Sequence, residues 1–171
     1  IGLFVLLGRG AGSQDFGTYA APAGMAGGLF VLGLAGFGTK AGLYPLHVWL
    51  PEAHPAAPSP VSAVMSGVMI KTGIYGIVRL LVMLGTVPGW CAWLVLGIGA
   101  ASGILGVLFA LAQHDLKRLL AYHSVENIGI IALGIGLGML GVHAGMPVLA
   151  ALGFAGGLLH VLNHAIFQGL L

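Results

Sequence analysis

The stretch Trp90–Ala112, WCAWLVLGIGAASGILGVLFALA, decides the fold class, because its 23 consecutive residues carry no charge. About 20 apolar residues let an α-helix cross the hydrocarbon core of a bilayer, since each residue adds about 1.5 Å. The whole chain has the same character: of its 171 residues, 58% are hydrophobic and only 6% are charged. A soluble domain carries roughly 25% charged residues. We therefore expect an all-α membrane protein.

The composition also excludes several other classes of protein. Disordered chains are polar and rich in charge. Proteins that bind nucleic acid need a basic stripe, whereas the net charge of +2 comes from scattered residues, so no nucleic-acid partner is expected. Cys91 is the single cysteine, so the chain cannot build a disulfide framework, a thiolate zinc site or an iron–sulfur cluster by itself. We expect neither a metal nor a redox cofactor.

Polar and proline-rich segments divide the chain into apolar stretches of membrane-spanning length. Five full spans are expected, namely Gly24–Trp49, Val61–Leu84, Trp90–Ala112, Leu119–Leu140 and Pro147–Leu171. The connections expected between them are Arg9–Ala23, Leu50–Pro60, Gly85–Gly89, Gln113–Arg118 and Gly141–Met146. A short apolar stub, Ile1–Gly8, counts as a partial span. Both ends stop within apolar sequence, so we interpret the chain as a polytopic helix bundle cut from a larger protein.

The few loop charges indicate an orientation. The segment Gln113–Arg118 contributes Lys117 and Arg118, whereas Arg9 is the one Lys or Arg in the loops of the opposite side. The positive-inside rule therefore places Gln113–Arg118 on the cytoplasmic side. We expect a multi-pass protein of the cell's inner, or plasma, membrane.

Glycine occurs 31 times, mostly within the expected spans. Several pairs lie four residues apart, as in Gly134/Gly138 and Gly153/Gly157. Small residues at this spacing let the backbones of membrane helices approach closely. We expect these glycines to serve packing.

Two lysines are expected near the middle of the membrane. Lys40 and Lys71 each lie about ten residues from the cytoplasmic end of adjacent antiparallel spans, which corresponds to a depth near 15 Å. A lysine at that depth costs about 3 kcal/mol on insertion scales, and such residues usually line ion pathways. The alternative is a lysine that is merely buried against backbone carbonyls.

The surroundings of Lys40 predict an interrupted helix. Gly36, Gly38 and Gly42 surround this lysine, and Pro45 follows. A break here would expose backbone polar groups, which must then line a polar cavity rather than lipid.

The last span carries His160 and His164 four residues apart, with Gln168 one turn further on. This spacing puts all three side chains on one helix face. Two histidines so placed could bind a metal or haem, but either site would need further ligands from other helices. Histidine titrates near neutral pH, so a proton relay is the use we favour.

Glu126 is the one carboxylate within an expected span, and His123 lies three residues before it on the same face. An acid and a histidine in this arrangement could exchange protons with the cytoplasmic side. A purely structural alternative, in which Glu126 pairs with Lys117 or Arg118, is equally compatible with the sequence.

Three strings of sequence resemble a known family. They are Lys40–His54, KAGLYPLHVWLPEAH; Ala57–Ala63, APSPVSA; and Asp115–Tyr122, DLKRLLAY. They look like the antiporter-like membrane subunits shared by respiratory complex I, Mrp antiporters and membrane-bound hydrogenases. The strings His123–Ile131, HSVENIGII, and Leu162–Ala165, LNHA, resemble the hydrogenase-4 and formate hydrogenlyase branch.

The resemblance implies that residues 1–171 are part of one transmembrane domain built from two inverted repeats. It implies that Lys40 is the midplane lysine of a broken helix, that Lys71 is the next relay lysine, and that His160 and His164 continue the relay. The glutamate that partners the Lys40 position in this family lies on an earlier helix. Gln168 departs from the family pattern, in which a lysine is usual.

The function implied is translocation of protons, or of sodium ions, by a membrane subunit of a redox-driven complex. Such a subunit has no catalytic centre of its own, and its partners would be other membrane subunits and peripheral hydrogenase or iron–sulfur subunits. An Mrp-type cation/proton antiporter module and a passive membrane anchor for a hydrogenase are the alternatives. The buried lysines argue against the anchor, which does not need them.

Overall fold

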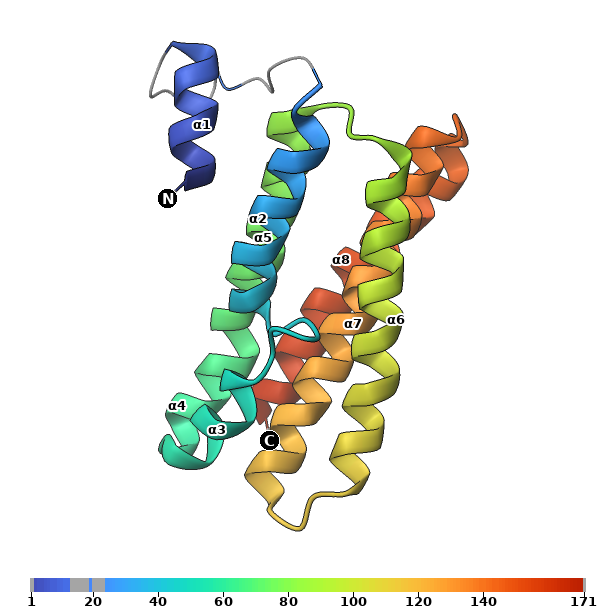
Figure 1. The fold of residues 1–171 in the computed structure, drawn as a ribbon. Coiled ribbons are helices and arrows are strands. Elements are labelled where there is room, and N and C mark those ends of the chain that lie inside the picture. The colour runs from blue at the N-terminus through green and yellow to red at the C-terminus, as the bar shows by residue number, and fades with distance from the viewer. Residues whose placement is uncertain (1, 13–18, 20–23, 171) are drawn as a thin grey trace.

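A computed structural model describes residues 2–12, 19 and 24–170 of the chain, and Figure 1 shows their arrangement. All regular elements of the described part are helices, which confirms the all-α class. Its elements are α1 (Gly2–Ala11), α2 (Ala26–Ala41), α3 (Trp49–Ala56), α4 (Ser59–Val64), the π-helical segment η2 (Met65–Met69), α5 (Ile70–Leu84), α6 (Gly89–Leu111), α7 (Leu116–His143) and α8 (Pro147–Leu170).

Four helices of the described part are long and apolar enough to cross a membrane: Ser59–Leu84, Gly89–Leu111, Leu116–His143 and Pro147–Leu170. They match four of the five expected spans to within three residues at each described end. The first of them joins α4, η2 and α5 into one continuous helix. The fifth expected span, Gly24–Trp49, is wrong as a single helix, because α2 has only 16 residues and ends at Ala41.

The end of α2 follows from the glycine after it. Gly42 adopts φ 84°, a left-handed conformation that side chains disfavour, and its N–H donates to the carbonyl of Gly38 at 2.9 Å. The indole Nε1 of Trp49 donates to the carbonyl of Thr39 at 2.7 Å, so a second carbonyl of the last turn is also satisfied. The expected break beside Lys40 is therefore present. The expected span continued to Trp49 because its limits rest on average hydropathy, which does not register a single left-handed residue.

Two connections are more helical than expected. Helix α1 includes Arg9, which we had placed in a loop; residues 13–18 and 20–23 of that loop lie outside the described residues. The connection Leu50–Pro60 holds most of α3 and the first turn of α4. The ammonium of Lys117 donates to the carbonyl of Ala57 at 2.7 Å, which satisfies the carboxyl end of α3.

The helices form two groups, visible in Figure 1. Helix α2 lies along α5, and α7 lies between α6 and α8. The loop that follows α2 reaches across to the second group, where the N–H of Tyr44 donates to Ser102 Oγ of α6 at 2.9 Å. Helix α3 contacts α7, and η2 contacts α8. Elements far apart in the sequence therefore meet in the middle of the molecule.

Glycines determine how closely α7 and α8 approach. A Cβ atom added at Gly153 would lie 2.3 Å from the backbone nitrogen of Gly138, and one added at Gly134 would lie 2.7 Å from Cα of Gly157. No side chain fits at either position without moving the backbone. The expected packing role of these glycines is confirmed for the α7–α8 pair.

Candidate functional site

Polar side chains gather inside a molecule whose outer surface is mostly apolar. The structure buries nine of them: His47, His54, Ser66, Lys71, Ser102, Ser124, Asn127, His164 and Gln168. Burial of polar groups in a membrane protein is costly, so such residues mark candidate ion pathways.

Lys71 lies at the start of α5 and is 9% exposed. Its ammonium donates to the backbone carbonyl of Ser66, which belongs to the π-helical segment η2. Segments of π-helix are rare and often occur at functional sites, because the wider turn changes the backbone hydrogen bonding. The side chain is therefore turned into the protein rather than toward lipid.

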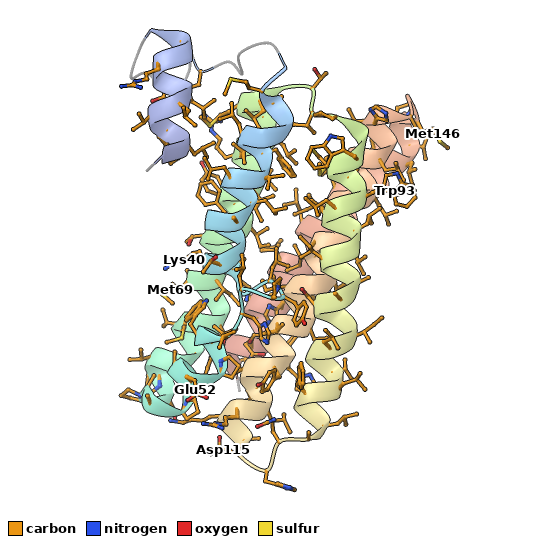
Figure 2. All side chains as sticks on the ribbon, viewed as in Figure 1. Lys40, Glu52, Met69, Trp93, Asp115 and Met146 are labelled. Carbon is orange, nitrogen blue, oxygen red and sulfur yellow. The ribbon has the colours of Figure 1, made fainter. Side chains whose placement is uncertain are left out.

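Lys40 occupies the same level of the α2–α5 pair but points elsewhere. A Cβ atom added at Gly73 of α5 would lie 2.6 Å from the backbone nitrogen of Ala41, so the two helices touch beside both lysines. Lys40 itself is exposed on the outer side of α2 and points away from α6, α7 and α8 (Figure 2). The structure thus brings the two lysines to one level without turning them toward one another.

His164 and Gln168 lie on the buried face of α8. His164 is 0% exposed, and neither of its ring nitrogens makes a hydrogen bond with a described residue. Gln168 is 4% exposed, and its Oε1 likewise has no partner in the described part of the chain. Asn163, which the sequence places next to His164, is exposed on another face of the helix. The face shared by His164 and Gln168 is the one we expected.

A chain of contacts runs from α7 to α8. His123 Nδ1 and Glu126 Oε2 are 2.7 Å apart, and Asn127 Nδ2 donates to the carbonyl of His123 at 2.7 Å. Asn127 Oδ1 in turn accepts from His160 Nε2 at 2.9 Å. Of the two arrangements we left open for Glu126, the structure shows the contact with His123. The carboxylate that pairs with Arg118 is instead that of Glu52, at 3.3 Å.

Lys71, Glu126 and the two histidines of α8 interact electrostatically. The charge of Lys71 acts on both His160 and His164, and the charge of Glu126 acts on His160 with the opposite sign. Interactions of this kind are strong inside a membrane protein, where water screens little. A proton gained or lost by Lys71 therefore changes the electrostatic environment of His160 and His164 on α8.

Sequence reasoning missed His54, which belongs to α3. His54 is 1% exposed, and its Nδ1 and Nε2 lie 2.5 Å from Ser62 Oγ and 3.1 Å from Ser66 Oγ. Burial and the charge of Lys117 both lower the pKa of His54 below its ordinary value of 6.5. The signal in the sequence was the spacing of Ser59, Ser62 and Ser66, which puts three hydroxyls on one helix face.

A cavity of about 140 Å³ lies next to this histidine. Its polar lining comes from Ser59, Ser62, Ser66, Lys117 and Gln168. The cavity is therefore lined both by the two serines that contact His54 and by the buried amide of Gln168 on α8. Within residues 2–12, 19 and 24–170, no group of three or more histidine, cysteine, aspartate or glutamate side chains is arranged to hold a metal ion.

A bundle of membrane-spanning helices with ionisable groups in its interior defines a class of protein: a polytopic membrane protein with a candidate ion path. Comparison with known proteins specifies the family. The profile of the NADH:quinone oxidoreductase/Mrp antiporter transmembrane family matches residues 13–168, and the chain belongs to that family.

Several relatives are similar over most of this chain. Hydrogenase-4 component B of Escherichia coli K12 is 52% identical over 98% of the chain, and formate hydrogenlyase subunit 3 of the same organism is 46% identical over 84%. NADH-quinone oxidoreductase subunit N of Desulforudis audaxviator is 42% identical over 80%. These matches cover 26%, 24% and 26% of the respective relatives. The chain thus spans about a quarter of their length.

Proposed function

We propose that this chain forms part of a proton-translocating membrane subunit of a redox-driven complex of the hydrogenase-4 or formate hydrogenlyase type. One observation carries the proposal: Lys71 is buried, bonded to a π-helical carbonyl, and electrostatically coupled to His160 and His164. A structural lysine would not need titratable neighbours on another helix. A relay does, because each group must be able to pass on the proton it receives.

The proposed relay uses the groups of the polar interior in spatial order. Lys71 exchanges protons with His164 and His160 on α8, and Gln168 orders water beside His164. From His160 the path continues through Asn127, an amide that cannot titrate but can hold water. It then reaches the half-exposed pair of His123 and Glu126, where the relay can exchange protons with the cytoplasmic side.

Lys40 extends this relay on the other side of Lys71. An exposed charge at this level of a membrane span is unfavourable against lipid. The relatives are about four times as long as this chain, and in the full-length protein another helix of the same fold would cover Lys40. We expect its partner on that helix to be a carboxylate. Such a carboxylate would neutralise the positive charge of Lys40 whenever the lysine is protonated.

The names of the relatives support the assembly we propose. Two of them are a component of hydrogenase-4 and a subunit of formate hydrogenlyase, so both belong to complexes of several chains. We infer that this protein sits in the inner membrane beside other membrane subunits and a peripheral hydrogenase with iron–sulfur subunits. Electron transfer would belong to those partners, and this chain would respond by moving charge.

The test uses the full-length protein in its complex, reconstituted into proteoliposomes. The double variant Lys40→Met, Lys71→Met should assemble, because methionine costs less in the membrane than lysine. It should lose most of the proton translocation. The variant Arg9→Met removes a cation of α1 and should translocate normally. Full translocation by the double lysine variant would overturn the proposal.

The family also includes Mrp antiporters, which makes a cation/proton antiporter module the second candidate. The two candidates differ in their driving force. An antiporter exchanges protons for sodium ions and needs no electron donor. The redox-driven subunit moves protons only during electron transfer. Translocation driven by a sodium gradient alone would favour the antiporter.

A further inference from the structure

The environment of His54 resembles that of a proton carrier more than that of a packing residue. Both ring nitrogens lie within hydrogen-bonding distance of a serine hydroxyl, at 2.5 Å from Ser62 and 3.1 Å from Ser66. A neutral imidazole has one donor and one acceptor nitrogen, and a hydroxyl can fill either role. Both tautomers of His54 are therefore satisfied in place, and the ring can accept a proton on one side and release one from the other.

The two serines connect different places. Ser62 and Ser66 both line the cavity of about 140 Å³, so this side of His54 is within reach of the space between α4, α7 and α8. Ser66 also provides the carbonyl that accepts from the ammonium of Lys71. One residue thus contacts His54 through its hydroxyl and Lys71 through its backbone. His54 itself is only 1% exposed.

The elements around His54 hold it in this position. Lys117 of α7 bonds the carbonyl of Ala57 next to the end of α3, and Arg118 pairs with Glu52 on α3 itself. The charged groups facing His54 are therefore Lys117 and, beyond Ser66, Lys71. Glu52 is engaged by Arg118 on the outside of the helix (Figure 2 shows Glu52 at the same end of the molecule as Asp115).

We propose that His54 carries protons between this cavity and Lys71, and is thereby the entry group of the relay. The proposal rests on the proposed function, since it needs Lys71 to translocate protons. In the transfer, the ring gains a proton at Nδ1 from Ser62, which is resupplied from the cavity. It releases the Nε2 proton to Ser66 Oγ, whose own hydroxyl proton passes to a neutral Lys71 amine. The products are neutral His54, intact serines and the Lys71 ammonium.

The decisive variant is His54→Gln in the full-length protein, assayed in proteoliposomes. The amide of glutamine can donate to one serine and accept from the other, so a structural role would be preserved, but it cannot carry a proton. We expect translocation to fall about tenfold or more, as is common when a proton-transfer group is removed. In His54→Ala, added imidazole should restore part of the rate. His114→Gln, which replaces an exposed histidine near α7, should translocate normally.

Two outcomes separate this inference from the proposed function. If Lys71→Met is inactive while His54→Gln translocates normally, His54 is not the entry group, although the relay through Lys71 stands. If both variants translocate normally, both proposals are overturned. Should His54→Gln fail to assemble, two variants of Ser62 test the inference instead. Ser62→Ala should be slow and Ser62→Thr, which keeps the hydroxyl, should be active; a normal rate for Ser62→Ala would overturn the inference.

Discussion

His164 has the least satisfied environment among the described residues. Its ring is fully buried, yet neither nitrogen has a hydrogen-bond partner among the described residues, and Oε1 of Gln168 beside it has none there either. A buried polar group without a hydrogen bond costs about 1–3 kcal/mol. Three such atoms close together favour a site that holds water. A hydrated histidine near a buried lysine suits proton transfer better than packing.

Position 168 holds a glutamine where the family usually has a lysine, and this difference leads to a prediction about three variants. His164→Ala should reduce translocation strongly, by about tenfold or more, because it removes a titrating group. Gln168→Ala should cost less, since glutamine only orders water. Gln168→Lys should be tolerated, because it restores the residue usual in the family. Proton uptake into proteoliposomes measures all three.

The opposite ranking would contradict this role for Gln168. If Gln168→Ala were as damaging as His164→Ala and Gln168→Lys were inactive, the glutamine would have a positional role instead.

The lowered pKa of His54 predicts how stability depends on pH. Because its pKa in the folded protein lies below 6.5, the unfolded chain binds the proton more readily. Stability from this group is therefore complete above pH 6.5 and is lost as the pH falls through the folded pKa. Lys117→Gln removes one cause of the shift, so the variant should lose less stability on acidification. Thermal midpoints of the purified full-length protein at about pH 7.5 and about pH 5 measure this.

His54→Gln provides the control for this experiment, since it removes the titration and should also flatten the pH dependence. An acid-induced loss in the Lys117→Gln protein as large as that of the wild type would contradict the explanation.

Among the helices, the α7–α8 pair shows how small residues determine the architecture. The buried face of α8 carries Gly153 and Gly157 in one half and His164 and Gln168 in the other. The glycines bring the two backbones into contact, and this approach positions His160 against Asn127 of α7. Packing at one end of the helix therefore sets the geometry of the polar groups at the other.

This dependence predicts that Gly153→Ala destabilises the protein. The added methyl would lie 2.3 Å from the nitrogen of Gly138, and overpacking of this kind typically costs about 1–3 kcal/mol. Gly156→Ala, on the same helix with nothing within 4 Å of its Cβ position, is the matched control and should be neutral. Heating the detergent-purified protein and measuring the folded fraction compares them. Equal thermal midpoints would show that α7 and α8 are not in such close contact.

Across the whole molecule, the sequence predicted the helical class and four spans because long, mostly uncharged apolar segments are stable only when lipid surrounds them. It predicted the break after Lys40 from Gly42, yet hydropathy extended the span to Trp49, since averaging over a window cannot register a single left-handed residue. It singled out Lys71 by its cost in a membrane and His164 by its spacing from His160, and the structure buries both side chains. It missed His54, whose burial depends on α3 docking against α7, a tertiary contact between residues about 60 positions apart.

The two proposals together describe a chain of polar groups near the cytoplasmic end of the bundle. It links the cavity between α4, α7 and α8 to His54 and Lys71, continues to His164 and His160, and reaches His123 and Glu126 near the start of α7. Several of its steps join side chains from different helices, so the chain of groups exists only in the folded bundle. The longer chain of the relatives would add the covering helix at Lys40.

If Lys71 is an obligatory proton carrier, the number of protons moved per electron transferred must depend on it, and proteoliposomes containing the complex measure this ratio. We predict that Lys71→Met lowers this ratio to near zero while the partner subunits still transfer electrons, because the proposed function assigns electron transfer to those subunits. A ratio equal to that of the wild type would contradict the account.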